Sequence, residues 1–134
     1  MNKIEEKIRG HFKSREEIIA VYLFGSYQVG KAGPSSDTDI GILLDEDKLD
    51  HRMGIIDNCM VDLGKLLRKD IHPVILNFAS EELLRQIFVK GKCILINDSN
   101  RLSRFKMVRF VQIADFAYYR KQMQSGLIRK VMGS

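Results

Sequence analysis

Two acidic residues, Asp37 and Asp39, have the types and the spacing best suited to chemistry in this 134-residue chain. An apolar run from Ile40 to Leu44 follows them and predicts a strand that the two acids open. Because residues i and i+2 of a strand point to one face, the two carboxylates would lie side by side, about 7 Å apart along the backbone. Like charges this close need a cation or a shared proton, and hard oxygen ligands favour Mg²⁺ as the cation.

A second small motif, Gly25-Ser26, follows an apolar run of β-forming residues from Val21 to Phe24. Glycine lets the backbone approach a ligand closely, and free N–H groups at the start of a helix attract anions. This turn therefore suits phosphate groups, and the acidic pair suits the metal that phosphates bring with them. Each motif taken singly also fits an ordinary turn. Their order, with a strand on either side, favours the chemical interpretation.

The combination of Gly25-Ser26, ten further residues and Asp37-Thr38-Asp39 resembles the signature of the DNA polymerase β-like nucleotidyltransferase superfamily. At this length the chain is similar to the minimal nucleotidyltransferases, the MNT or MntA-like proteins that are paired with HEPN-domain partners in toxin–antitoxin operons. The neighbouring residues 23–26 (LFGS) and 36–40 (SDTDI) agree with that family. The resemblance covers residues 15–98 and extends less specifically into the C-terminal segment.

The resemblance implies a polymerase β-like fold of the α/β (α+β) class: a small mixed, twisted sheet of about four strands with flanking helices and a long C-terminal helix. It implies that Asp37 and Asp39 are catalytic and hold Mg²⁺, and that Gly25 and Ser26 bind the phosphates of ATP. The implied reaction is transfer of AMP from ATP to a hydroxyl group, with a tyrosine of a HEPN toxin as the expected acceptor. The chain would then be the antitoxin of the pair.

The chain departs from the family at the third carboxylate, which is expected at the first position of a run of the form D-x-V-x-L-N. Residues 74–77 (VILN) fit the end of that run and place His72 at the acidic position. Neutral histidine can act as a base near pH 7 but is a poor ligand for Mg²⁺. His72 is therefore a candidate catalytic residue, and Asp70, expected on the same side, is the alternative source of the carboxylate. In the remaining interpretation His72 fills space and Asp70 faces water. Pro73 places this strand at a sheet edge or at a bulge.

This departure leaves open a second function from another class, a catalytically weak or inactive antitoxin that neutralises a HEPN ribonuclease by binding to it. The C-terminal extension, residues 99–134 beside a nucleotidyltransferase domain of residues 1–98, supports this alternative. Between Phe105 and Tyr119, within a helix predicted from Ser99 to Ser125, eleven of fifteen positions are apolar or aromatic. One apolar stripe would be enough for packing on the domain alone. This breadth suggests a second contact, with another chain, whereas a broad contact with the core of the domain is the other interpretation. Taken with the resemblance, it implies a hetero-oligomer with the HEPN toxin, and a homodimer is the alternative assembly.

The charge of the chain is unevenly distributed. The net charge of +5 combines a value of −2 for residues 1–100 with +7 for residues 101–134. A basic tail suits an acidic partner, a solvated helix face or nucleic acid, but no nucleic-acid-binding motif is present, so that third function is the weakest. Two cysteines, no signal-like start and no apolar run of membrane length predict a cytoplasmic protein with reduced thiols and no membrane contact.

Elements on either side must position the candidate residues. Apolar periodicity predicts helices over residues 2–13, 51–69 and 80–90 and strands over residues 18–24, 71–78 and 93–96. Tyr22 is expected in the core, and His11 at the surface. The helix over residues 51–69 is expected to bury one face, formed by Met53, Ile56, Met60, Leu63, Leu66 and Leu67.

Overall fold

The computed structural model describes residues 3–25, 38–112 and 121. The chain divides into two units, Met1–Leu102 and Ser103–Ser134, and each is described by itself. All elements of the sheet and the helices around it belong to the first unit.

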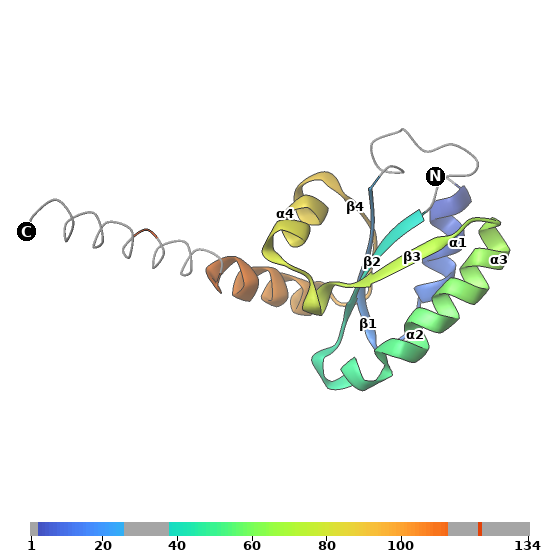
Figure 1. The fold of residues 1–134 in the computed structure, drawn as a ribbon. Helices are drawn as coiled ribbons and strands as arrows, with labels where there is room; N and C mark the ends of the chain where they lie inside the picture. The colour runs from blue at the N-terminus through green and yellow to red at the C-terminus, as the bar shows by residue number, and fades with distance from the viewer. Residues whose placement is uncertain (1–2, 26–37, 113–120, 122–134) are drawn as a thin grey trace, which may run out of the picture. The chain divides into compact units, whose positions relative to one another are not determined.

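The first unit is built on a four-stranded sheet in the order β3-β2-β1-β4 (Figure 1). The strands are β1 (Ile18–Phe24), β2 (Thr38–Leu44), β3 (Ile71–Ile75) and β4 (Lys92–Ile96). β1 is antiparallel to both of its neighbours, whereas β2 and β3 are parallel. The mixed sheet predicted from the sequence is therefore confirmed, and β1 and β2, the strands that flank the candidate motifs, lie at its centre.

The two central strands are buried on both faces. All seven residues of β1 are buried, and Asp39 is the one residue of β2 that is not. Continuous apolar runs without polar alternation are typical of strands that are covered on both sides. A carboxylate in such a strand is costly to desolvate unless it has a partner or a function. Asp39 therefore stands out on burial alone.

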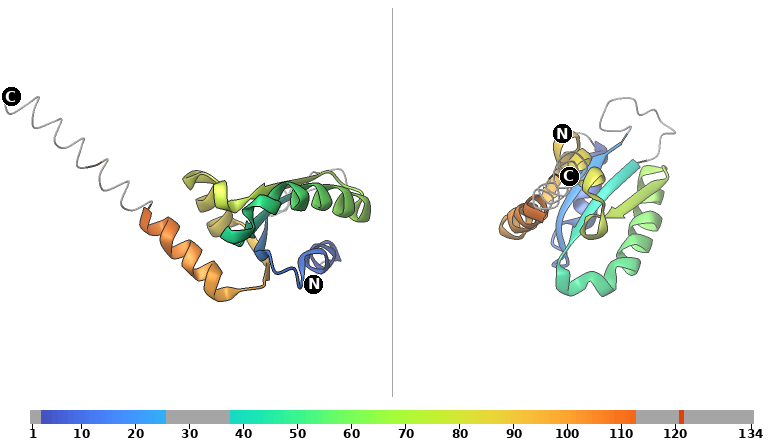
Figure 2. Two further views of the ribbon diagram at one scale, coloured as in Figure 1. Left: turned by 90° about the horizontal axis from the view of Figure 1, so that it is seen from below. Right: turned by 60° about the vertical axis from the view of Figure 1, so that its left-hand side comes forward.

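Helices cover both faces of the sheet (Figures 1 and 2). α1 (Lys3–Phe12) and the helical segment between β2 and β3 contribute to one apolar core on one face. α4 (Glu81–Lys90) lies on the other face, where the ring of Phe88 meets the ring of Tyr22 edge to face at 5.3 Å between centroids. The predicted core position of Tyr22 is confirmed, because only 3% of it is exposed.

The alternation of side chains along β1 assigns each residue to one of these two faces. Val21 and Leu23 belong to the main core with α1, so Tyr22 and Phe24 point toward the α4 face. The antiparallel register pairs Phe24 with Asp39. Residues that pair directly across strands share a face, so the Asp39 carboxylate also points to the α4 face.

The connection between β2 and β3 is helical along most of its length. It comprises a 3₁₀ helix (Glu46–His51), α2 (Arg52–Asn58), a π-helical turn (Cys59–Leu63) and α3 (Gly64–Leu67). It ends at Arg68, whose φ of 53° is left-handed. The helix predicted over residues 51–69 is confirmed, but its regularity is interrupted.

The buried face of this segment differs from the predicted one. Ile55, Cys59 and Leu63 are buried at a regular spacing of four residues. A π-helical turn holds more residues per turn than an α-helix, which favours this spacing over the alternating three and four of a regular helix. The sequence prediction was wrong for three of its six residues, Met53, Met60 and Leu66, which are exposed.

α4 begins and ends as its sequence predicts. The hydroxyl of Ser80 caps its start by accepting a hydrogen bond from the Leu83 N–H at 3.2 Å. Gly91 ends it at a point of close backbone approach. A side-chain carbon added at Gly91 would overlap the Ile87 carbonyl oxygen and lie 3.0 Å from that of Leu23.

β3 is shorter than the strand predicted over residues 71–78, because the chain turns into a 3₁₀ helix (Leu76–Phe78). The side chain of Asn77 makes up for the missing pairing. Its Oδ1 accepts from the Leu44 N–H and its Nδ2 donates to the Leu44 carbonyl, both at 2.9 Å. This pair of hydrogen bonds, which we call the Asn77 clamp, fastens the segment after β3 to the end of β2.

His11 is half-buried in α1, which corrects the expected surface position. Its Nε2 atom is buried without a hydrogen-bond partner among the described residues, and its ring meets Phe12 edge to face. Burial lowers the pKa of His11, and the charge of Arg15 lowers it further against an opposing effect of Asp62. The uncharged imidazole is therefore the form that this environment favours.

The last described helix runs over residues 99–112. Asp98 caps it, since its Oδ1 accepts from the Arg101 N–H at 3.0 Å. Four large apolar side chains on it are exposed: Met107, Val108, Phe110 and Val111. Most of the predicted continuation to Ser125 lies outside the described residues, and the functional division expected at residue 98 stays a prediction. Across the part of the chain that the structure describes, no helix has the length and apolar character needed to cross a membrane.

Candidate functional site

The site is organised around Asp39, the second residue of the central strand β2. β2 is hydrogen-bonded on both sides, so the backbone of Asp39 is held between Phe24 of β1 and His72 of β3. Its two neighbours in sequence, Thr38 and Ile40, are fully buried, whereas the Asp39 side chain is half-buried. β2 therefore holds the Asp39 carboxylate at the edge of the core, where a ligand can reach it.

Gly25 lies directly against that carboxylate. Its φ of 77° is left-handed, a conformation that side chains rarely tolerate. A side-chain carbon at this position would overlap Oδ2 of Asp39 and lie 3.1 Å from its Cγ. Gly25 is therefore required twice, by the turn that ends β1 and by the space that the Asp39 carboxylate occupies. We call this space the Gly25 cradle.

His72 is the parallel partner of Asp39 on the edge strand β3. Paired residues share a face of the sheet, so the imidazole lies on the same face as the carboxylate. His72 is exposed. Pro73 is the next residue of β3. Because proline lacks an N–H group, it predicted that this strand lies at a sheet edge or at a bulge, and β3 is an edge strand of the sheet.

Asp70 contacts β2 through its backbone carbonyl group. Its carbonyl accepts a hydrogen bond from the Thr38 N–H at 2.9 Å, one residue before β3 begins. Its side chain is exposed. The backbone contact aligns β3 with β2, and a role for the Asp70 side chain as third carboxylate stays a prediction.

The floor beside Asp39 is apolar. Gly41 follows Asp39 on the same face, and a side-chain carbon there would lie 2.9 Å from Cδ2 of Leu76. Leu76 is fully buried and fills the space that Gly41 leaves. An apolar floor strengthens the electrostatic interactions of a carboxylate above it because it excludes water.

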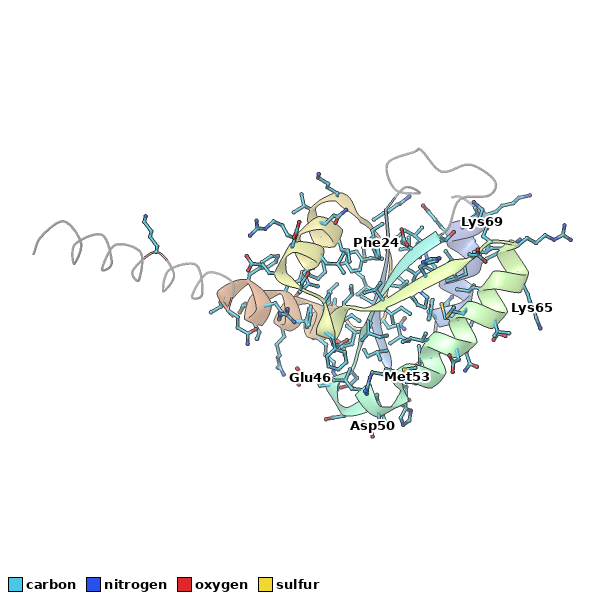
Figure 3. All side chains as sticks on the ribbon, in the orientation of Figure 1. Phe24, Glu46, Asp50, Met53, Lys65 and Lys69 are labelled. Carbon is cyan, nitrogen blue, oxygen red and sulfur yellow. The ribbon has the colours of Figure 1, made fainter. Side chains whose placement is uncertain are left out.

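The candidate residues lie at one end of the sheet. β1 ends there, and β2 and β3 begin there, as the labelled positions of Phe24 and Lys69 show in Figure 3, with Glu46 and Asp50 at the opposite end. Lys69 and Arg68 precede β3 and bring positive charge to the end that holds the site. Sequence reasoning did not single them out, although a basic pair directly before a strand is the signal that could have done so.

Two predicted site residues, Ser26 and Asp37, lie outside the described residues, so their place beside Gly25 and Asp39 stays a prediction. Within residues 3–25, 38–112 and 121, no group of three histidine, cysteine, aspartate or glutamate side chains is arranged to hold a metal ion. The described part of the site thus offers a carboxylate, an imidazole on a neighbouring strand and the Gly25 cradle. This donor set can bind a cation.

Comparison with solved structures finds several chains with the same fold. A structure described as a toxin–antitoxin with AMP-PNP is 23% identical, with a TM-score of 0.62 over 96% of this chain and 98% of that one. A second, described as a tri-AMPylated Shewanella oneidensis HEPN toxin in complex with MNT antitoxin, is 22% identical, with a TM-score of 0.56 over 96% of each chain. A third, described as the toxin–antitoxin MntA–HepT, is 21% identical, with a TM-score of 0.55 over 96% of this chain and 97% of that one. At this identity the likeness establishes the fold.

A search of curated proteins gives no match. A family model does match: residues 6–100 fit the model described as polymerase beta, nucleotidyltransferase. The matched segment includes every strand of the sheet, the Gly25 cradle, Asp39 and His72. The chain therefore belongs to the polymerase beta nucleotidyltransferase family.

Proposed function

We propose that this chain is a metal-dependent nucleotidyltransferase that transfers AMP from ATP to a hydroxyl group of a HEPN-domain toxin and so acts as its antitoxin. One observation carries the proposal. In a chain of the nucleotidyltransferase family, the carboxylate of Asp39 lies near the start of the central strand β2 and occupies the Gly25 cradle. Antitoxin function and the acceptor are supported by similarity of fold to the toxin–antitoxin complexes, one of which contains a tri-AMPylated HEPN toxin.

The residues present fit a divalent cation. The Asp39 carboxylate is a hard oxygen donor at the edge of an apolar floor. Because Gly25 has no side chain, the carboxylate keeps its place, whereas a larger residue at position 25 would displace it. Asp39 would hold the cation together with Asp37. A bound cation would supply Lewis-acid stabilisation of the charge that develops on the transferred phosphate and the leaving pyrophosphate.

The remaining roles belong to the chain's own residues. Backbone N–H groups at Gly25 and Ser26 would orient the phosphates of ATP, because Gly25 has no side chain that would keep the backbone away from them. In the transfer, the acceptor oxygen forms a bond to the α-phosphorus while the bond from that phosphorus to the bridging oxygen breaks and pyrophosphate leaves. The proton of the hydroxyl would pass to a base at the site, for which His72 and Asp70 are the two candidates. The similarity of fold to a complex with AMP-PNP, an ATP analogue, supports ATP as the donor.

Asp39→Asn tests the proposal most directly. The amide keeps the size of the side chain and removes its charge, so AMP transfer to a co-expressed HEPN partner should fall by at least about a hundredfold. Intact-mass spectrometry of the partner measures the transfer. Asp57→Asn, a matched change at an exposed position of α2, should leave the transfer unchanged. Undiminished transfer by the Asp39→Asn variant would contradict the proposal.

A binding antitoxin that acts without transfer is the second candidate. The exposed apolar side chains of Met107, Val108, Phe110 and Val111 favour it, because they suit contact with another protein. The same variant separates the two functions. If the Asp39→Asn protein still protects cells from the toxin and the partner gains no mass, neutralisation by binding is the function.

A further inference from the structure

The pairing of His72 with Asp39 brings two different metal donors together. The register of β2 and β3 runs without interruption through five pairs, from Thr38 with Ile71 to Ile42 with Ile75, and Asp39 with His72 is the second pair. An imidazole nitrogen and a carboxylate oxygen therefore sit on neighbouring strands, on the same face of the sheet. Among the described strands, His72 is the histidine that pairs with a candidate metal ligand.

The position of His72 is set by the strands and not by a loop. The Asp70 carbonyl holds the start of β3 to β2, and the Asn77 clamp holds its far end. A donor on such a fixed element keeps its distance from its neighbour, which is what a metal site requires. His72 is also exposed, so an ion from solvent can reach its ring.

The chemistry of this pair differs from that of two carboxylates. Mg²⁺ takes oxygen ligands and binds imidazole poorly. Mn²⁺ prefers carboxylate, carbonyl and water oxygens as Mg²⁺ does, but it is the first ion of the transition-metal series whose members also bind nitrogen donors. Replacing one oxygen donor by imidazole therefore shifts the affinity of a site from Mg²⁺ toward Mn²⁺.

We propose that the centre at Asp39 selects Mn²⁺ over Mg²⁺ because His72 supplies a nitrogen ligand beside the carboxylate. The proposal rests on the proposed function for the presence of a metal at Asp39, but its own content, nitrogen ligation and the resulting selectivity, is separate. His72 is then a ligand that sets which cofactor the chain takes, and because its lone pair is given to the metal, Asp70 is left as the candidate base of the transfer.

Pulsed electron paramagnetic resonance with Mn²⁺ alone tests the ligation directly. The full-length chain with bound Mn²⁺ should show modulation from a directly coordinated nitrogen. His72→Asp should abolish that modulation while Mn²⁺ still binds, because an oxygen donor replaces the nitrogen. His51→Gln, at an exposed histidine in the 3₁₀ helix after β2, is the matched control and should retain the signal. Bound Mn²⁺ without nitrogen modulation, or modulation that survives in His72→Asp, would overturn the proposal.

Competition between the two ions provides the second measurement. In the His72→Asp variant the ratio of Mn²⁺ affinity to Mg²⁺ affinity should fall by at least about tenfold. Loss of a residue that only supports a metal ligand already lowers metal affinity by about tenfold or more, so loss of a ligand should have at least that effect. Circular dichroism verifies that the variant is folded. An unchanged ratio would count against the proposal.

Failure of this proposal can be told from failure of the proposed function. AMP transfer by a chain whose Mn²⁺ shows no nitrogen ligation, or by a chain that binds no Mn²⁺, would refute the ligand role of His72 and leave the transferase intact. A nitrogen-ligated Mn²⁺ in a chain that transfers no AMP would support the ligand role and refute the transferase.

Discussion

Gly25 combines a left-handed backbone conformation with a direct contact to the Asp39 carboxylate. Gly25→Ala should lower the free energy of unfolding by about 1–2 kcal/mol, because alanine at a φ of 77° is strained. The added carbon would also displace the Asp39 carboxylate. The loss of binding free energy for Mn²⁺ and for ATP should therefore exceed the loss of unfolding free energy. Calorimetric titration of the folded variant measures the affinities.

Gly10→Ala is the matched control for this change. Gly10 lies within α1 with open space where its side chain would be, so alanine should raise stability by up to about 1 kcal/mol and leave ligand binding unaltered. If Gly25→Ala bound both ligands with wild-type affinity, the cradle would have no role in placing Asp39.

Candidate residues could be picked out from the sequence where the argument depended on short spacing. The signature around Asp39 and the run of residues 74–77 were enough to single out His72, because the pattern itself assigns its position. The contact of Gly25 with Asp39 could not be read in the same way. It joins residues fourteen positions apart and arises only when β1 and β2 pair with Phe24 opposite Asp39.

At the scale of elements, the Asn77 clamp is the feature most open to a test. Asn77→Ala removes both hydrogen bonds to Leu44, a fully buried residue, and should cost about 1–3 kcal/mol of unfolding free energy. Urea denaturation measures the loss, and amide exchange at Leu44 should accelerate. The control Asn58→Ala, at an exposed position of α2, should stay within about 0.5 kcal/mol of the wild type. Unchanged exchange at Leu44 would refute the clamp.

Elements with one dominant period were predictable, and those with an interruption were not. The strand expected over residues 18–24 is β1 with the same bounds, since seven apolar residues in a row leave no alternative boundary. The helix over residues 51–69 was placed correctly, but its inner face was not, because a π-helical turn at Cys59–Leu63 shifts the register of burial. The spacing of apolar residues in this segment does not predict a π-helical turn.

At the scale of the whole molecule, stability should depend on pH through His11. Its pKa in the folded chain is lowered, so below the usual value of about 6.5 the unfolded chain binds the proton first. The contribution of this residue to stability is therefore complete above that pH and is lost as the pH falls toward the folded-state pKa. Arg15 and Asp62 are the charged groups that act on the ring.

His11→Phe should flatten this pH dependence, because phenylalanine fills the site and takes up no proton. Urea unfolding at a series of pH values between about 7.5 and 5.5 measures the slope. His51→Gln should retain the slope of the wild type, since that histidine is exposed. Equal slopes in the wild type and the His11→Phe variant would show that another group controls the acid sensitivity.

Pro73 has a consequence for the solution behaviour of the molecule. The outer rim of β3 is a row of backbone groups open to a further strand, and such rims allow neighbouring molecules to add on and precipitate. Proline interrupts that row, because it has no hydrogen to offer an incoming chain. The strand that presents His72 to its ligand is in this way also protected from polymerising with copies of itself.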